Sequence, residues 1–140
     1  MLVHMRTCLI VLAVSTTVTA QAGEPNPAVR AEITSLLARL EASGCRFNRN
    51  GTWYSAPDAK HHMLVKLRYI EDRTTLASAE QFIELAGSKS SITGKPYLVQ
   101  CGEASAQTSA TWLTAQLNAL RAARAGQVKS GSEPTAPKLP

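Results

Sequence analysis

Apolar residues recur at helical spacing in four stretches of this chain, and shorter alternating segments lie between them. The first stretch follows Asn26, a preferred N-cap residue, and has Pro27 at its first helical position. Gly44 stands just after it, where a glycine commonly ends a helix. The pattern predicts a helix over Pro27–Ser43, with an apolar face formed by Val29, Ile33, Leu36, Leu37 and Leu40.

Three more helices are expected from the same spacing. Two of them begin at capping boxes, in which a serine and an acid or amide three residues later satisfy free backbone groups. These boxes pair Ser55 with Asp58 and Ser78 with Gln81. We expect Ser109 to cap the last helix. The expected ranges are Ala56–Glu71, Ala79–Gly87 and Ser109–Arg124.

Two segments favour strands. Cys45–Ser55 alternates around Asn50-Gly51, the dipeptide that best accepts the positive φ angles of a tight hairpin turn. Tyr97–Cys101 is rich in residues that favour strands. The polar stretches that flank it, Ser88–Pro96 and Gly102–Thr108, are expected to be loops.

The first 22 residues have the order of a secretory signal peptide. Arg6 supplies the positive charge, Thr7–Thr19 is apolar, and Ala20-Gln21-Ala22 provides a small-residue cleavage motif. The apolar run is shorter than the roughly 20 residues that a membrane span needs. We therefore expect residues 1–22 to be removed and the remaining chain to be an exported, soluble protein.

Export changes the meaning of the cysteines. Cys8 leaves with the signal peptide, and Cys45 and Cys101 remain. In an oxidising compartment, two thiols favour one disulfide, here closing a loop of about 57 residues. Two free thiols are the alternative. A metal site is a weaker one, because no CxxC or HxxxH motif supplies further ligands.

A bond between Cys45 and Cys101 requires the first and last expected strands to be brought together. The element order α-β-β-α-α-β-α then predicts a small single-domain α+β fold. We expect a three-stranded antiparallel sheet with helices packed on it, its strand order open. Because side chains alternate along a strand, one of Trp53 and Tyr54 should be buried and the other exposed.

The end of the chain differs in composition from the rest. Residues 125–140 contain three prolines and two glycines and few apolar residues, which predicts a disordered tail after a single folded domain over 23–124. Without the signal peptide, 14 Lys and Arg against 10 Asp and Glu leave a net charge of +4. The charges are scattered, so nucleic acid is not an expected partner. A solubilising surface is the favoured interpretation of this charge, and weak attraction to acidic envelope polymers is the alternative.

A phosphate-binding loop is not supported by the Gly94-Lys95 pair. Its spacing from Gly87 is wrong, Pro96 replaces the hydroxyl residue that would hold magnesium, and a strand rather than a helix follows. The segment is better interpreted as an ordered connecting loop.

The His61-His62 pair is the other candidate for chemistry. Asp58 and Lys66 lie four residues either side of His62, so the three share a helix face. This spacing is compatible with a carboxylate-tuned histidine acting as a base or metal ligand, but also with an ordinary surface pair. No further residues complete a metal site or a catalytic triad, so we assign no catalytic residue, metal or cofactor.

Four blocks in this order resemble the YfeK-type family of small exported proteobacterial proteins of unknown function. The blocks are Phe47–Gly51, Ala59–Lys66 with His62 and Lys66, Ser78–Ile83, and Ser88–Val99 with Ser90, Ser91, Gly94, Lys95 and Tyr97. Met63 stands where that family usually has Leu, a near-isosteric exchange. The resemblance implies a Gram-negative bacterium and the periplasm, and it implies no activity.

These blocks suggest a shared binding patch. We expect the hairpin turn, the helix face with His62 and the serine-rich loop to converge, using Arg49, Asn50, His62, Lys66, Ser90, Ser91 and Lys95. The favoured function is a non-enzymatic periplasmic module that binds an envelope protein or an anionic envelope component. The alternatives are an enzyme that uses His62 with a serine or carboxylate, and a structural accessory protein without a small ligand.

Overall fold

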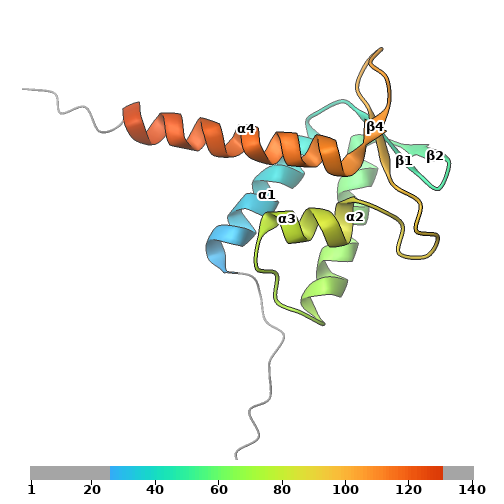
Figure 1. Cartoon of the computed structure of the whole chain (residues 1–140), viewed down its shortest axis with the longest axis horizontal. Coiled ribbons are helices and arrows are strands. Elements are labelled where there is room, and N and C mark those ends of the chain that lie inside the picture. Colours follow the sequence, from blue (N-terminus) through green and yellow to red (C-terminus); the bar gives the residue numbers. More distant parts are fainter. Residues whose placement is uncertain (1–25, 131–140) are drawn as a thin grey trace, which may run out of the picture.

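The computed structural model describes residues 26–130, which contain helices at one end and a small sheet at the other (Figure 1). The expected signal peptide, residues 1–22, lies outside the described residues. The helices are α1 (Pro27–Glu41), α2 (Ala56–Glu71), α3 (Ala79–Phe82), a π-helical turn η1 (Ile83–Gly87) and α4 (Ser109–Ser130). The strands are β1 (Arg46–Arg49), β2 (Thr52–Tyr54), β3 (Leu98–Gln100) and β4 (Gln107–Thr108).

The sheet has the order β2-β1-β3-β4, and all of its described pairs are antiparallel. The α+β class and the pairing of the hairpin with the last expected strand are confirmed. The expectation of three strands is wrong, because Gln107–Thr108 forms a fourth strand within the expected loop. This two-residue strand is polar and exposed, and it exists through its pairing with β3 rather than through any pattern of its own.

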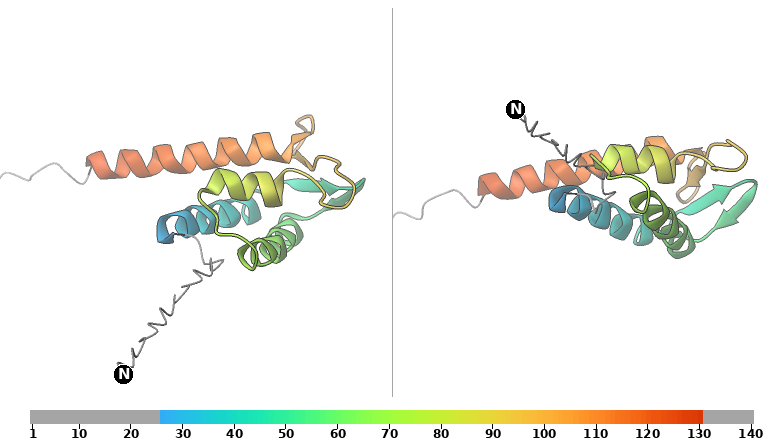
Figure 2. Two further views of the ribbon diagram at one scale, coloured as in Figure 1. Left: turned by 60° about the horizontal axis from the view of Figure 1, so that its bottom comes forward. Right: turned by 90° about the horizontal axis from the view of Figure 1, so that it is seen from below.

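Figure 2 shows the hairpin extending from the end of the helical layer beside α2, while α4 continues past α1 in the opposite direction. Side chains from α1, α2, α3, η1, β3 and α4 form one hydrophobic core. Leu36, Leu40, Phe82 and Leu113 are fully buried within it. No helix among residues 26–130 combines the length and the apolar character needed to cross a membrane.

Helix starts follow the expected caps, with one exception. The Ser55 side chain accepts from the Asp58 amide, and that of Ser78 accepts from the Gln81 amide. At α4, however, Thr108 and not Ser109 supplies the capping oxygen, which accepts from the Thr111 amide at 3.3 Å. Ser109 is buried, and its amide donates to the Tyr97 carbonyl at 2.8 Å.

Two further expectations need correction. The last helix continues to Ser130, so residues 125–130 are helical and not part of a tail, and the remaining expected tail lies outside the described residues. Trp53 and Tyr54 are both half-buried, because each ring packs beneath an arginine of β1.

The Cys45–Cys101 disulfide is present, with 4.3 Å between the Cα atoms. The β1–β3 register pairs Arg46 with Gln100, so the two cysteines occupy the next facing position of the same ladder. The bond therefore closes one end of the central strand pair.

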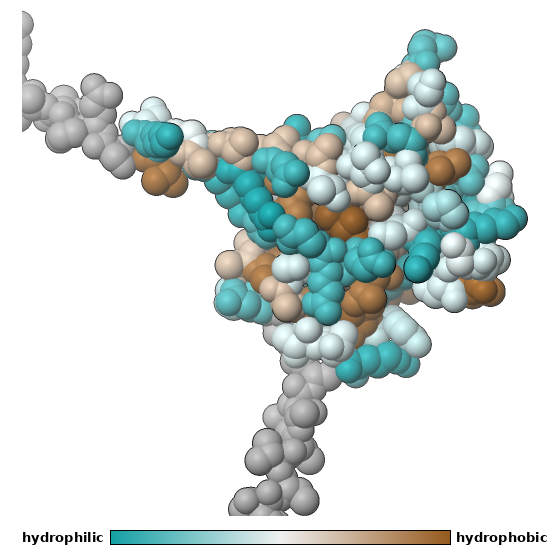
Figure 3. Space-filling view, in the orientation of Figure 1, coloured by the Kyte–Doolittle hydropathy of each residue, from teal (hydrophilic) through white to brown (hydrophobic). Residues whose placement is uncertain are grey.

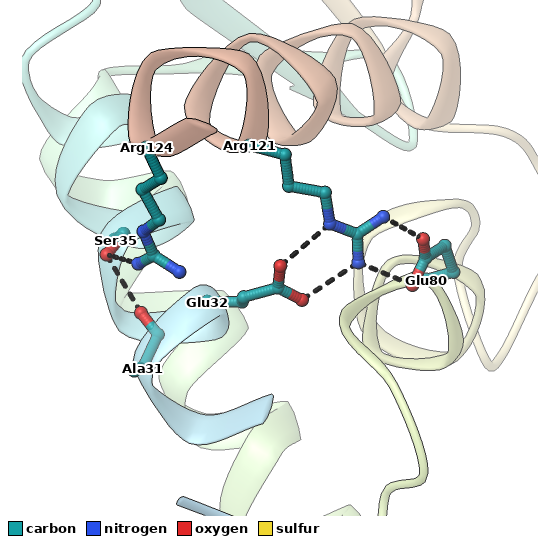
Figure 4. A network of polar contacts seen from close by, with 6 residues as sticks. All are labelled: Ala31, Glu32, Ser35, Glu80, Arg121 and Arg124. Carbon is teal, nitrogen blue, oxygen red and sulfur yellow. Dashed lines mark hydrogen bonds and ion pairs between the residues drawn. The ribbon is translucent and has the colours of Figure 1, made fainter. Parts of the chain in front are cut away.

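Arg121 connects three helices through two carboxylates (Figure 4). Its guanidinium donates to Glu32 of α1 at 2.7 and 2.8 Å and also bonds Glu80 of α3. These bonds lower the pKa of Glu80 to about 2 and also lower that of Glu32. Arg124, one turn later, bonds only the neutral hydroxyl of Ser35 among the described contacts.

Replacing both cysteines, in a Cys45→Ala/Cys101→Ala variant, should destabilise the fold. Without the disulfide, the unfolded chain regains conformational entropy worth at most roughly 4 kcal/mol for a loop of this length. We therefore expect a loss of about 2–4 kcal/mol in the free energy of unfolding. Urea denaturation measures this loss. A reducing agent should weaken the wild type and leave the variant unchanged; equal stability of both proteins would contradict the structural role of the bond.

Arg121→Gln should lower the free energy of unfolding by about 1 kcal/mol, because it removes a partly exposed ion-pair network between helices. Arg124→Gln is the matched control, since it removes the same charge one turn away but breaks only a hydrogen bond to a neutral hydroxyl. Thermal or urea unfolding of both variants checks the difference, and a larger loss for Arg124→Gln would refute it.

Candidate functional site

A pocket with a volume of about 440 Å³ lies between the hairpin, α2, and the residues that begin β3 and α4. Its apolar lining includes Phe47 of β1, Met63 and Val65 of α2, and the backbone of Gly87 at the end of η1. Its polar lining is formed by Arg49, Tyr54, Asp58, His61, His62 and Tyr97, with Asn48 and Ser109. A mainly apolar cavity with a few convergent polar groups is the usual form of a small-ligand site.

His62 is held between a cation and a phenol. The Arg49 Nη1 atom lies 2.5 Å from His62 Nδ1, and His62 Nε2 lies 3.3 Å from the Tyr97 hydroxyl. A guanidinium can only donate, so Nδ1 is the acceptor and the ring proton resides on Nε2, where it is donated to Tyr97. The three side chains thus form a directed chain of hydrogen bonds.

The neutral form of His62 is strongly favoured in this setting. Partial burial, followed by the charges of Arg49 and Lys66, lowers the pKa of His62 from 6.5 to about 4. The carboxylate-tuned histidine, one of the two interpretations that the sequence left open, is therefore not supported. Asp58 caps the start of α2 instead, where its carboxylate accepts from the Ser55 hydroxyl at 2.6 Å.

Lys66 lies on the other side of Tyr97. Its ammonium is 5.3 Å from the centre of the Tyr97 ring and donates to the Lys89 carbonyl at 3.2 Å. Burial and the charge of Arg49 lower the pKa of Lys66, and burial raises the pKa of the Tyr97 phenol. Tyr97 is therefore surrounded by positive charge while its own hydroxyl remains protonated.

Arg49 is positioned by aromatic and neutral groups. Its guanidinium stacks 4.8 Å from the centre of the Tyr54 ring and also bonds the Tyr54 hydroxyl at 3.4 Å. Among residues 26–130, neither Arg49 nor Lys66 forms a salt bridge with a carboxylate. Arg49 in the pocket lining, and Lys66 beside the Tyr97 ring, therefore carry charges that no carboxylate pairs with in this part of the chain.

A separate set of hydrogen bonds ties the hairpin turn to the loop before β3. The Asn50 side chain donates to the Ser90 hydroxyl at 3.4 Å and accepts from the Thr93 hydroxyl at 2.7 Å. The Ser90 oxygen also accepts from the amides of Ile92 and Thr93, so it closes its own turn. This latch holds the turn that positions Arg49.

The structure brings only part of the predicted patch together, and the residues that it brings together have different roles. Arg49 and His62 line the pocket and Lys66 lies beside the Tyr97 ring, whereas Asn50 and Ser90 form the latch. Ser91 and Lys95 have exposed side chains that make no described contact within residues 26–130. No group of three potential metal ligands occurs in that range.

Sequence reasoning placed no site role on Met63 or Gly87, and it did not assign a role to the Tyr97 hydroxyl. The sequence signal that could have identified Tyr97 is its place in the block Ser88–Val99, which resembles the YfeK-type family. Gly87 lies in none of the four blocks, so no such signal marks it. A Cβ there would lie 2.5 Å from Leu113 Cδ1 and 3.1 Å from Met63 Cε, so glycine allows η1 to pack closely at the pocket wall.

Comparison with known proteins identifies a family but no activity. Residues 27–121 match the family of unknown function DUF5329. The chain is also 40% identical over 68 residues to the uncharacterised protein YfeK of Salmonella typhimurium, covering 48% of this chain and 55% of that protein. It thus spans about half the length of this curated relative. No solved structure matches.

The pH dependence of stability should report the neutral state of His62. Because its pKa in the folded protein is depressed, its stabilising contribution is complete above pH 6.5 and is lost as the pH falls toward about 4. After discounting for partial exposure, we expect the wild type to lose roughly 1–2 kcal/mol more over this range than His62→Gln.

Urea denaturation at several pH values between 7 and 4 measures this difference. His61→Gln changes the exposed neighbouring histidine and is the matched control. If His62→Gln kept the same loss of stability as the wild type, a neutral, half-buried His62 would be ruled out.

Proposed function

This chain belongs to the family of unknown function DUF5329, and from its pocket we propose a non-enzymatic binding module that holds an anionic group of an envelope component. The observation that carries the proposal is Arg49, a lining cation with no salt bridge to a carboxylate among residues 26–130, beside the protonated Tyr97 hydroxyl, with Lys66 adding positive charge next to the Tyr97 ring. A carboxylate or phosphate would accept hydrogen bonds there and complement the positive charge.

Binding is better supported than catalysis by the state of His62. A general base works best with a pKa near the operating pH, whereas the surroundings of His62 lower its pKa to about 4. Both ring nitrogens also have partners, Arg49 and Tyr97. Ser90, one of the two serines of the predicted patch, is occupied in its own turn and in the latch.

We place this activity in the periplasm. The signal-peptide pattern of residues 1–22 supports export, and a disulfide between the two remaining cysteines is typical of oxidising compartments. A docking face for a protein partner has less support, because the large exposed apolar side chains are scattered over α2, η1, a loop and α4. On the face in Figure 3, apolar surface is likewise interrupted by polar residues.

A pair of matched small molecules tests anion binding. Acetate and acetamide have nearly the same shape, and only acetate is charged, so acetate should shift the NMR resonances of Arg49, His62 and Tyr97 while acetamide leaves them unchanged. We expect Arg49→Gln to weaken acetate binding at least fivefold, the loss of about 1 kcal/mol of charge-assisted bonding.

Lys95→Gln is the control, since it removes an equal charge from an exposed loop residue outside the pocket. It should retain acetate binding. Equal responses to acetate and acetamide, or shifts that map outside the pocket, would refute the proposed function.

A further inference from the structure

The hydrogen-bond chain at the pocket leaves one donor unused. Arg49 donates to His62 Nδ1, and His62 Nε2 donates to the Tyr97 oxygen. The hydroxyl hydrogen of Tyr97 is therefore not consumed by His62. It is free to be donated to a group in the pocket, and the cation at the start of the chain strengthens that donor.

The wall around this hydroxyl is largely hydrophobic. Phe47 and Met63 line the pocket although each is less than a tenth exposed, and Val65 adds a branched side chain at 44% exposure. The ring of Tyr97 belongs to the same wall. A small inorganic anion would satisfy the donor but would leave this apolar surface in contact with water.

We propose that the ligand is an amphiphile with a single acidic head group, bound with the head at the Tyr97 hydroxyl and Arg49 and the hydrocarbon body against Phe47, Met63 and Val65. This inference rests on the proposed function and specifies its ligand class. Positive charge at one end and apolar surface beside it match the two parts of such a molecule. The volume of about 440 Å³ lies in the range of small-ligand pockets.

Asp58 is the one acidic residue that lines the pocket within the described chain, and its carboxylate raises the competing possibility of a cationic head group. Its carboxylate is bonded to Ser55 at the start of α2, whereas Arg49 and Lys66 have no paired acid among residues 26–130. The head group is therefore anionic rather than cationic, and a cationic amphiphile is the control that tests this sign.

Four probe compounds distinguish the contribution of the acidic head group from that of the hydrocarbon body: octanoate, acetate, octanol and octylammonium. Each methylene that leaves water contributes about fourfold in affinity, so burial of about four methylenes makes octanoate roughly 250-fold tighter than acetate. These affinities are measured by titrating each compound into the oxidised chain without residues 1–22, with calorimetry and NMR of the Met63 methyl group as readouts. Octanol and octylammonium should bind at least tenfold more weakly than octanoate.

A hydroxyl deletion tests the head-group contact. Tyr97→Phe keeps the ring and should weaken octanoate about tenfold while leaving octanol binding unchanged, which also shows that the pocket is intact. Tyr69→Phe makes the same change at an exposed tyrosine of α2 outside the pocket, and should have no effect.

The outcomes separate this inference from the proposed function. If acetate bound and octanoate bound no more tightly, the amphiphilic ligand would be refuted but the anion site would be retained. Octanol or octylammonium binding as tightly as octanoate would overturn the acidic head group. Binding of none of the four would refute the proposed function and the inference together.

Discussion

The pairing of β1 with β3 is the constraint on which the rest of the structure depends. Its register matches Phe47 with Val99, and the same register places Cys45 opposite Cys101 at one end and Arg49 opposite Tyr97 at the other. Because facing residues two apart share a side of the sheet, the disulfide, a core pair and the head of the pocket stand in one row. A slip of one residue would move all of them to the other face.

The paired positions of β1 and β3 place Arg49 beside Tyr97, close to the second cation, Lys66. Partial burial, together with the charges of Arg49 and Lys66, lowers the pKa of His62 and keeps its ring neutral. His62 therefore links Arg49 to Tyr97 without adding a third charge. The Asn50 latch and the disulfide fix the two ends of the hairpin on which Arg49 stands. The geometry therefore arises from strand register and local turns rather than from any one strong interaction at the pocket.

Local signals made much of the fold predictable. The capping serine and the proline of the first turn define α2 over the predicted range, and Asn50-Gly51 provides the hairpin turn, with positive φ at both residues. β4 was not predictable, because two polar residues become a strand only by pairing with β3. Low apolar content hid the helical residues 125–130, where Gly126 weakens a helix by about 1 kcal/mol without ending it.

The pocket was predictable as a meeting of segments but not in its chemistry. Helical spacing linked His62 to Asp58 and Lys66, whereas its actual partners, Arg49 and Tyr97, lie 13 and 35 residues away. Spacing along one helix carries no information about such contacts. For the same reason, Ser90 could not be distinguished from Ser91, although one closes a turn and the other faces solvent.

The tautomer of His62 tests the central claim most directly, since everything at the pocket follows from a neutral ring that accepts from Arg49 and donates to Tyr97. Nitrogen-15 NMR of the histidine ring at pH 6 distinguishes the possible states. The structure predicts a neutral His62 with its proton on Nε2 and an unprotonated Nδ1. A ring protonated on both nitrogens at that pH, or on Nδ1 alone, would contradict the account.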